Sequence, residues 1–131
     1  MATYQPIVPS ASWPKSFTFS PGVRVGNLVF LSGTTATDEK GRIVGVGDII
    51  AQTRHIFQKF AAVMAAAGGG LEHIVETTDY VLSLQDYAKT VEVRREVFKG
   101  PPWPAATGLV VSGLVRADAL IEIKGIAVLP A

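Results

Sequence analysis

Apolar side chains recur at three- and four-residue steps between residues 49 and 67, which is the pattern of an amphipathic helix. Asp48 precedes this stripe and is a favourable N-cap residue, while Gly68, Gly69 and Gly70 follow it and predict its end. The stripe consists of Ile49, Thr53, Ile56, Phe57, Phe60, Val63, Met64 and Ala67. We therefore expect one long helix that packs a single face on the core.

A second helix is predicted from Tyr87 to about Phe98, with Asp86 as its cap and with Tyr87, Val91 and Val97 on its apolar face. Short runs rich in β-branched residues and bounded by turn formers predict the strands. These runs lie within residues 17 to 32, at 42–44, at 75–83, at 107–113 and at 119–129. The order of elements predicts an α+β fold with a mixed sheet and both helices on one face, in a single domain over residues 1–131.

The last predicted strand alternates between two faces. Ile121, Ile123, Gly125 and Ala127 point to one face, and Leu120, Glu122, Lys124, Ile126 and Val128 point to the other. The second face mixes a carboxylate with aliphatic side chains, which fits a sheet surface buried against a neighbouring subunit, with a polar site at the junction. A composition of 48% hydrophobic and 18% charged residues also favours an oligomer, because small domains leave much of their surface exposed.

Charge and composition exclude several classes of function. The net charge of +1 gives no field that would hold nucleic acid, and no apolar run approaches the roughly 18 residues that span a bilayer. The absence of cysteine rules out disulfides, thiolate metal sites and a cysteine nucleophile, and it is typical of an intracellular protein. We expect a cytoplasmic protein without metal or cofactor, in which His55 and His73 lie at the surface.

Glu122 is the most informative acidic residue, because it interrupts a strand that otherwise resembles core. Desolvation would raise the pKa of such a carboxyl group and suit it to proton transfer, unless Glu122 pairs with Lys124 or an arginine across the sheet. Ser32 and Gly33 end a strand, where a hydroxyl and backbone N–H groups could bind an oxyanion or carbonyl. An ordinary turn at the strand end is the alternative.

Arg94 and Arg95 lie on the second predicted helix beside Glu92 and Glu96. They either form a solvated face with intrahelical pairs or supply an anion contact.

Five segments, in order, resemble the Rid superfamily, also called the YjgF/YER057c/UK114 family. They are RVGNLVFLSG, AQTRHIFQKFAAVMAAAGG, VETTDYVLSLQDYAKT, WPAATGLVV and LIEIKGIAV. The resemblance covers residues 17 to 128. It implies a chorismate-mutase-like α+β fold and a homotrimer with a site in each of three clefts between subunits. Active members hydrolyse enamines and imines such as 2-aminoacrylate to a 2-keto acid and ammonia.

The match to the site of the active members is partial. Ser32 and Gly33 fit the family's Ser-Gly element, and Glu122 fits its glutamate in the last strand. The family's Pro-Ala-Arg-Ser motif stands here as Pro104-Ala105-Ala106-Thr107, so the resemblance implies that the substrate-binding arginine is absent. The same alignment puts Phe19 in place of a tyrosine and Val91 in place of an asparagine, and Trp103 precedes the altered motif.

These observations lead to two main hypotheses. The first is a trimeric hydrolase of a C–N bond in a small nitrogen-containing metabolite other than 2-aminoacrylate. In it Glu122 positions water, Ser32 with the Gly33 and Thr107 backbone binds the carbonyl-like end, and Phe19, Val91, Trp103, Ala106 and either Arg94 or Arg95 line the substrate site. The second is a non-catalytic trimer that binds a small metabolite or a partner protein in the same clefts. RNA cleavage is disfavoured by the charge.

Overall fold

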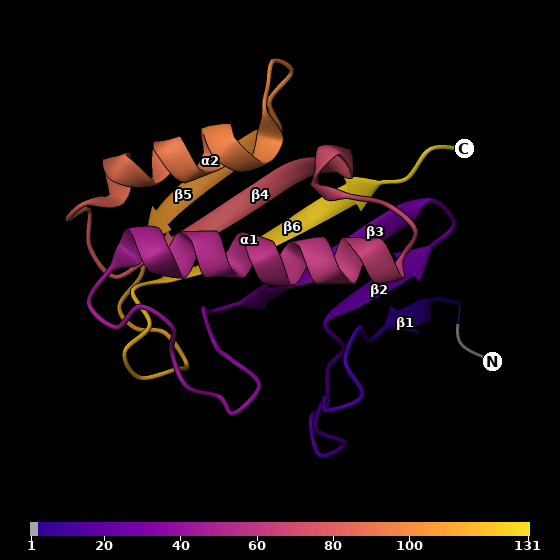
Figure 1. The fold of residues 1–131 in the computed structure, drawn as a ribbon, viewed down its shortest axis with the longest axis horizontal. Coiled ribbons are helices and arrows are strands. Elements are labelled where there is room, and N and C mark those ends of the chain that lie inside the picture. Colours follow the sequence, from indigo (N-terminus) through magenta and orange to yellow (C-terminus); the bar gives the residue numbers. More distant parts are fainter. Residues whose placement is uncertain (1–2) are drawn as a thin grey trace.

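Six strands form one mixed sheet in the computed structural model, which describes residues 3–131 (Figure 1). The strands stand in the order β1-β2-β3-β6-β4-β5. Neighbouring strands are antiparallel except β4 and β5, which are parallel. Their bounds are β1 Gln5–Ile7, β2 Gly22–Val25, β3 Leu28–Thr34, β4 Ile74–Val81, β5 Ala105–Val110 and β6 Ile121–Val128.

The long helix α1 spans Ile49–Ala66 and crosses one face of the sheet (Figure 1). Its predicted cap is confirmed, because the Asp48 side chain accepts hydrogen bonds from the backbone N–H groups of Ile50 and Ala51 at 3.0 and 3.1 Å. The apolar stripe is buried as expected: Phe57 and Ile56 have no exposed surface and Phe60 has almost none. Helix α1 therefore covers the centre of the sheet.

The second helix begins later than the sequence predicts. Residues Tyr87–Thr90 form a short 3₁₀ helix, η2, and the α-helix α2 covers only Val91–Phe98. Asp86 does not cap it: this residue has a left-handed backbone, and its carboxylate pairs with Lys89 at 3.0 Å. The predicted apolar face is only partly confirmed: Tyr87 and Val97 pack against the core, but Val93 is the fully buried valine whereas Val91 stays 43% exposed. Helices α1 and α2 lie on the same face of the sheet, as expected (Figure 1).

Two other strand predictions differ from the structure. Residues 42–44 form no strand and contribute only an isolated bridge between Thr37 and Ile43. The edge strand β1 has no counterpart in the prediction, because it is three residues long and contains Pro6. A second short 3₁₀ helix, η1 at Leu71–His73, connects α1 to β4.

The two faces of β6 differ as the alternation predicts. Ile121, Ile123 and Ala127 are fully buried beneath the helices. The opposite face carries Phe30, Leu28 and Val128, which are 40%, 37% and 36% exposed. The helices thus leave one largely apolar sheet face uncovered. No helix among residues 3–131 is long and apolar enough to cross a membrane.

Two polar side chains of α1, the buried Gln52 and the partly buried Lys59, hold the loops around the sheet. Gln52 donates to the carbonyls of Gly45 and Asp118 at 3.1 Å and accepts from the N–H of Leu120 at 2.8 Å, so it fixes the loop that leads into β6. Lys59 donates to the carbonyl of Thr35 at 2.9 Å and to the hydroxyl of Thr37 at 2.8 Å. It also donates to the hydroxyl of Thr34, the last residue of β3. Helix α1 therefore anchors the ends of the two strands that carry Gly33 and Glu122.

Candidate functional site

A cavity of about 310 Å³ opens on the sheet face that the helices leave bare. Glu122 and Lys124 enter it from β6, Tyr80 from β4 and Gly33 from β3. Its remaining wall is the loop between β5 and β6, which contributes Val111, Gly113, Leu114 and Val115. The cavity therefore combines a carboxylate, an ammonium and a phenol with an apolar wall, and its volume suits a small metabolite.

A β-bulge brings Gly33 up to Glu122. Leu31 pairs with Gly125 and Thr34 pairs with Ile123, so Ser32 and Gly33 together stand opposite Lys124 alone. A side chain at position 33 would have no room, since a Cβ there would lie 2.6 Å from Glu122 Oε2. The glycine therefore lets the Glu122 carboxylate rest against the backbone of β3.

The half-buried Glu122 carboxylate is not paired with a cation. Among residues 3–131, no basic side chain lies within 4.0 Å of its oxygens, so the predicted alternative of a pair with Lys124 or an arginine is not seen. Tyr80 stands directly opposite Glu122 on β4. An unpaired carboxylate beside a small cavity is able to hold a water molecule and to exchange a proton with it.

Ser32 lies beside this cavity with both of its donors engaged. Its hydroxyl donates to the carbonyl of Ser20 at 2.6 Å, and its backbone N–H donates to the carbonyl of Pro21 at 3.0 Å. The catalytic role predicted for Ser32 would require the hydroxyl to leave Ser20. The hydroxyl oxygen can still accept a hydrogen bond.

Phe19 belongs to an aromatic cluster before β2. Its ring stacks on Phe17 at 5.3 Å and meets the edge of Trp13 at 5.2 Å, and it remains 51% exposed. The Trp13 indole N–H donates to the Phe19 carbonyl at 3.2 Å. The cluster presents an exposed aromatic surface.

The remaining predicted residues lie on β5, on α2 and in the loop between them. Ala106 pairs with Thr77 of β4, a residue buried on the helix-facing side, so Ala106 faces the same way. Thr107 points to the opposite face. Trp103 in the loop and Val91 at the start of α2 are 48% and 43% exposed.

The two arginines of α2 have different surroundings. Arg95 is exposed and pairs with Glu92 at 3.4 Å, as the solvated-face alternative predicts. Arg94 turns beneath the helix, where Nη1 lies 4.0 Å from Oδ1 of the buried Asp79 and the guanidinium lies over the ring of Phe98 at 5.2 Å. The Tyr87 hydroxyl donates to the other Asp79 oxygen at 2.8 Å.

Burial dominates the electrostatics of this Asp79 cluster. It raises the pKa of Asp79, while the hydrogen bond from Tyr87 and the charge of Arg94 act in the opposite direction. Burial and the hydrogen bond to Asp79 raise the pKa of Tyr87 to about 12. Sequence reasoning missed Asp79 and Tyr87, and only their polar character within apolar segments could have signalled them. Arg94 thus lies beside a buried carboxylate without a hydrogen bond to it, since Nη1 of Arg94 and Oδ1 of Asp79 are both buried and have no hydrogen-bond partner.

The predicted residues thus form two groups that one chain does not bring together. Gly33 and Glu122 share a cavity on the bare face of β3 and β6. Ala106 lies on the helix-facing side of β5, which is separated from β6 by β4.

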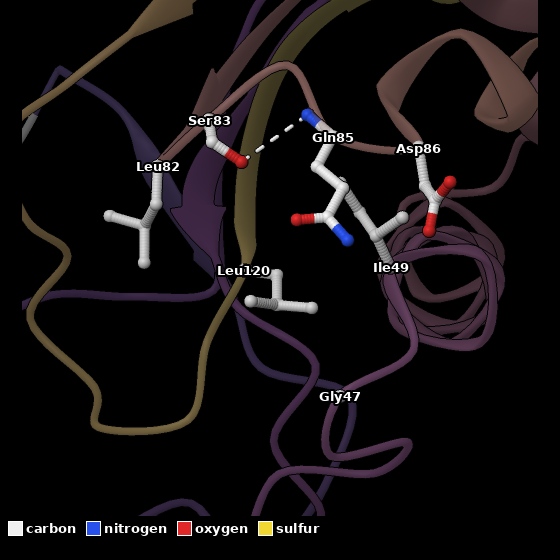
Figure 2. Close-up of a pocket in the computed structure, with 7 residues that line it drawn as sticks. All are labelled: Gly47, Ile49, Leu82, Ser83, Gln85, Asp86 and Leu120. Carbon is white, nitrogen blue, oxygen red and sulfur yellow. Dashed lines mark hydrogen bonds between the residues drawn. The ribbon is translucent and has the colours of Figure 1, made fainter.

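A second cavity, of about 170 Å³, lies at the start of α1 (Figure 2). Its lining includes Leu82, Ser83, Gln85, Asp86 and Leu120, and Figure 2 shows the Ser83 hydroxyl accepting from the N–H of Gln85 at 3.3 Å. None of the predicted site residues lines it.

Neither histidine joins a metal-binding group. Within residues 3–131, no cluster of three His, Cys, Asp or Glu side chains could hold a metal ion. Both histidines are partly buried and contact the backbone: His55 Nε2 lies 3.1 Å from the Thr37 carbonyl, and His73 Nδ1 accepts from Gly70 at 3.0 Å. The expectation that both histidines lie at the surface is thus only partly met.

Comparisons with known proteins agree with the geometry. The model of the endoribonuclease L-PSP family matches residues 11–129. A 3-aminoacrylate deaminase, RutC of Acinetobacter baylyi, is 34% identical over 121 residues, which are 92% of this chain and 94% of the relative. The structure of RidA from an Antarctic Psychrobacter is 28% identical with a TM-score of 0.81, over 98% of this chain and 100% of its own.

The structure of the protein YJGH is also 28% identical, with a TM-score of 0.86 over 99% of both chains. The family match and the relative at 34% identity extend over nearly the whole of this α+β fold. The chain therefore belongs to the endoribonuclease L-PSP family, the Rid/YjgF superfamily.

Proposed function

We propose that this protein is a Rid-type hydrolase that cleaves a C–N bond in a small imine or enamine and releases a keto compound and ammonia. The observation that carries the proposal is the unpaired Glu122 carboxylate, which rests against Gly33 in a cavity of about 310 Å³. The name of the RutC relative, a 3-aminoacrylate deaminase, supports the same class of reaction.

The Glu122 carboxylate would act as general base and then as general acid. An enamine first takes a proton from solvent at carbon and becomes an iminium ion. Glu122 accepts a proton from water as the water oxygen bonds to the iminium carbon, which gives a neutral carbinolamine. Glu122 then returns this proton to the nitrogen, the C–N bond breaks as the hydroxyl oxygen forms the C=O bond and loses its proton to solvent, and ammonia leaves. One water is consumed for each ammonia released.

The substrate would differ from 2-aminoacrylate, because position 106 supplies no guanidinium. A bidentate contact between arginine and a carboxylate contributes about 1.5 to 3 kcal/mol, so its loss weakens capture by roughly one to two orders of magnitude. Arg94 is engaged with Asp79 at 4.0 Å and Arg95 with Glu92 at 3.4 Å. Neither arginine is therefore an unengaged replacement.

A homotrimer with shared sites would unite the two groups of residues. Glu122 and Ala106 lie on opposite faces of strands that are not neighbours, and the uncovered sheet face carries exposed Phe30 and Leu28. Association of copies would bury this face and place β5 of one subunit beside β3 and β6 of the next. Light scattering at micromolar concentration should then give three times 13.9 kDa, and a monomer would contradict the shared site.

The function is tested by trapping the keto product from a panel of imines and enamines generated in situ. Glu122→Gln keeps the shape of the side chain but cannot accept a proton, so we expect it to abolish turnover while the protein stays folded and associated. Persistent turnover in Glu122→Gln would assign Glu122 a structural role. If the wild type binds keto acids but turns over no member of the panel, the non-catalytic alternative holds.

A further inference from the structure

Lys124 lines the same cavity as Glu122 and comes from the same strand. The two residues are separated by one position on β6, so their side chains stand on the same face of the sheet, roughly 6.6 Å apart along the strand. The strand thus presents a carboxylate and an ammonium side by side to one small cavity.

Lys124 has no ion-pair partner in the described part of the chain, where no carboxylate oxygen lies within 4.0 Å of its Nζ. Its cross-strand neighbours are uncharged: Thr78 stands opposite on β4, and the bulge residues Ser32 and Gly33 stand opposite on β3. The exposed ammonium therefore has no direct ion-pair partner in the cavity, although the Glu122 carboxylate stands two positions away on the same face.

We propose that Lys124 binds the carboxylate of the substrate, so that the cavity takes a small acid whose C–N group lies at Glu122. This inference rests on the proposed function for the chemistry at Glu122, but the carboxylate contact itself does not depend on turnover. The ligand class is a short imino or enamino acid, or the keto acid that it becomes.

The charges of the cavity match such a ligand. An imino acid carries a negative carboxylate at one end and a nitrogen that is positive when protonated at the other. The carboxylate would pair with Lys124, and the protonated nitrogen would face Glu122 until water adds. A ligand held in this way has its reacting carbon beside the bulge at Gly33, where Glu122 Oε2 approaches β3 closely.

This arrangement also gives position 106 a simple interpretation. With Lys124 as the anion contact, a substrate carboxylate is still held without an arginine on β5, but by a point charge and not by the bidentate guanidinium contact whose loss weakens capture of 2-aminoacrylate. The cation would have moved from the edge strand β5 to the central strand β6, next to the catalytic acid. The ligand then lies along β6, so selectivity depends on Tyr80 and on the apolar loop residues that close the cavity.

The test measures binding of pyruvate and of methyl pyruvate, which lacks the carboxylate charge, by NMR titration of the folded oligomer. Lys124→Met removes the ammonium and keeps most of the side-chain length, whereas Lys124→Arg retains a cation. Lys40→Met is the matched control, because Lys40 is an exposed lysine outside the cavity lining. Glu122→Gln is titrated as well, since the contact between Lys124 and the pyruvate carboxylate should not require the Glu122 carboxylate.

We expect Lys124→Met to weaken pyruvate binding about tenfold or more, Lys124→Arg to stay within about threefold, and Lys40→Met to match the wild type. Methyl pyruvate should bind weakly and equally to the wild type and Lys124→Met. Wild-type affinity for pyruvate in Lys124→Met, equal affinity for the acid and its ester, or no pyruvate binding by the wild type would each overturn the proposal.

These outcomes are separate from those that decide the proposed function. Binding of pyruvate that depends on Lys124, in a protein that hydrolyses no imine, would support the carboxylate contact while the hydrolase fails. Turnover that survives Lys124→Met with unchanged KM would keep the hydrolase and remove the carboxylate contact.

Discussion

Adding one methyl group at position 33 should show whether activity depends on where the Glu122 carboxylate lies, because the methyl group moves the carboxylate without removing it. The Cβ of Gly33→Ala would lie 2.6 Å from Glu122 Oε2, 3.5 Å from Cδ and 3.7 Å from Cγ. Ordinary van der Waals contact begins at about 3.4 Å, so the carboxylate oxygen has to move by about 0.8 Å. The methyl group therefore acts on the part of Glu122 that would handle water.

This displacement has a large expected effect on rate and a small one on stability. A misplacement of about 1 Å in a reacting group can cost up to about a hundredfold, so we expect kcat/KM to fall between about tenfold and a hundredfold. The displaced atom is the end of a flexible side chain, so the free energy of unfolding should change by less than about 1 kcal/mol. The fall should appear mainly in kcat, because the role proposed for the carboxylate is on the bound imine.

The assay compares keto acid release and urea unfolding for the wild type, Gly33→Ala and Gly113→Ala. Gly113→Ala is the matched control in the same cavity, because a Cβ there meets no atom within 4 Å. Gly33→Ala is also made in a Glu122→Ala background, where the clash is absent and the methyl group should cause no further loss in the free energy of unfolding. Full activity in a folded Gly33→Ala would refute the placement of Glu122 against the bulge.

Three further predictions concern other parts of the chain. Ala106→Arg should raise kcat/KM for 2-aminoacrylate about ten- to a hundredfold, and no gain in a folded oligomer would show that the cleft serves another ligand. Burial, reinforced by the charge of Arg116, lowers the pKa of Lys59 from 10.5 to about 8. Between about pH 8 and pH 10.5 the unfolded state therefore binds more protons than the folded state, so the free energy of unfolding should rise with pH. Lys59→Met should flatten this rise when urea midpoints are measured against pH, and an unchanged slope would contradict the prediction. Gln52→Leu removes three hydrogen bonds to the backbone of the surrounding loops and should cost about 3 kcal/mol in urea unfolding, with a loss below about 1 kcal/mol counting against its role.

Local signals made most of the fold predictable. The stripe of α1 and its Asp48 cap depend on neighbouring residues, and the alternation in β6 separates Ile121 from Glu122 without any tertiary information. The errors arose where a local pattern was short or ambiguous. Val91 and Val93 are both apolar, and only packing on the sheet decides that Val93 is buried.

The site was predictable only in part. Glu122 is conspicuous as an acid within an apolar strand, and Gly33 follows from the strand end. The bulge that joins them depends on the register of β3 against β6, which no local pattern encodes. Likewise, Arg94 lies beside the buried Asp79 because of the way α2 packs on β4. The sequence alone therefore could not show which of Arg94 and Arg95 turns toward the sheet.

The exposed edge strand β5 affects how prone a separated subunit would be to aggregate. All six of its residues are exposed, it pairs only with β4, and it carries neither a charge nor a proline. A strand edge of this kind offers free N–H and C=O groups to any other extended chain, and natural proteins usually protect such edges. In the trimer proposed above, covering β5 would therefore also protect the protein from open-ended aggregation, so that assembly would safeguard solubility as well as complete the site.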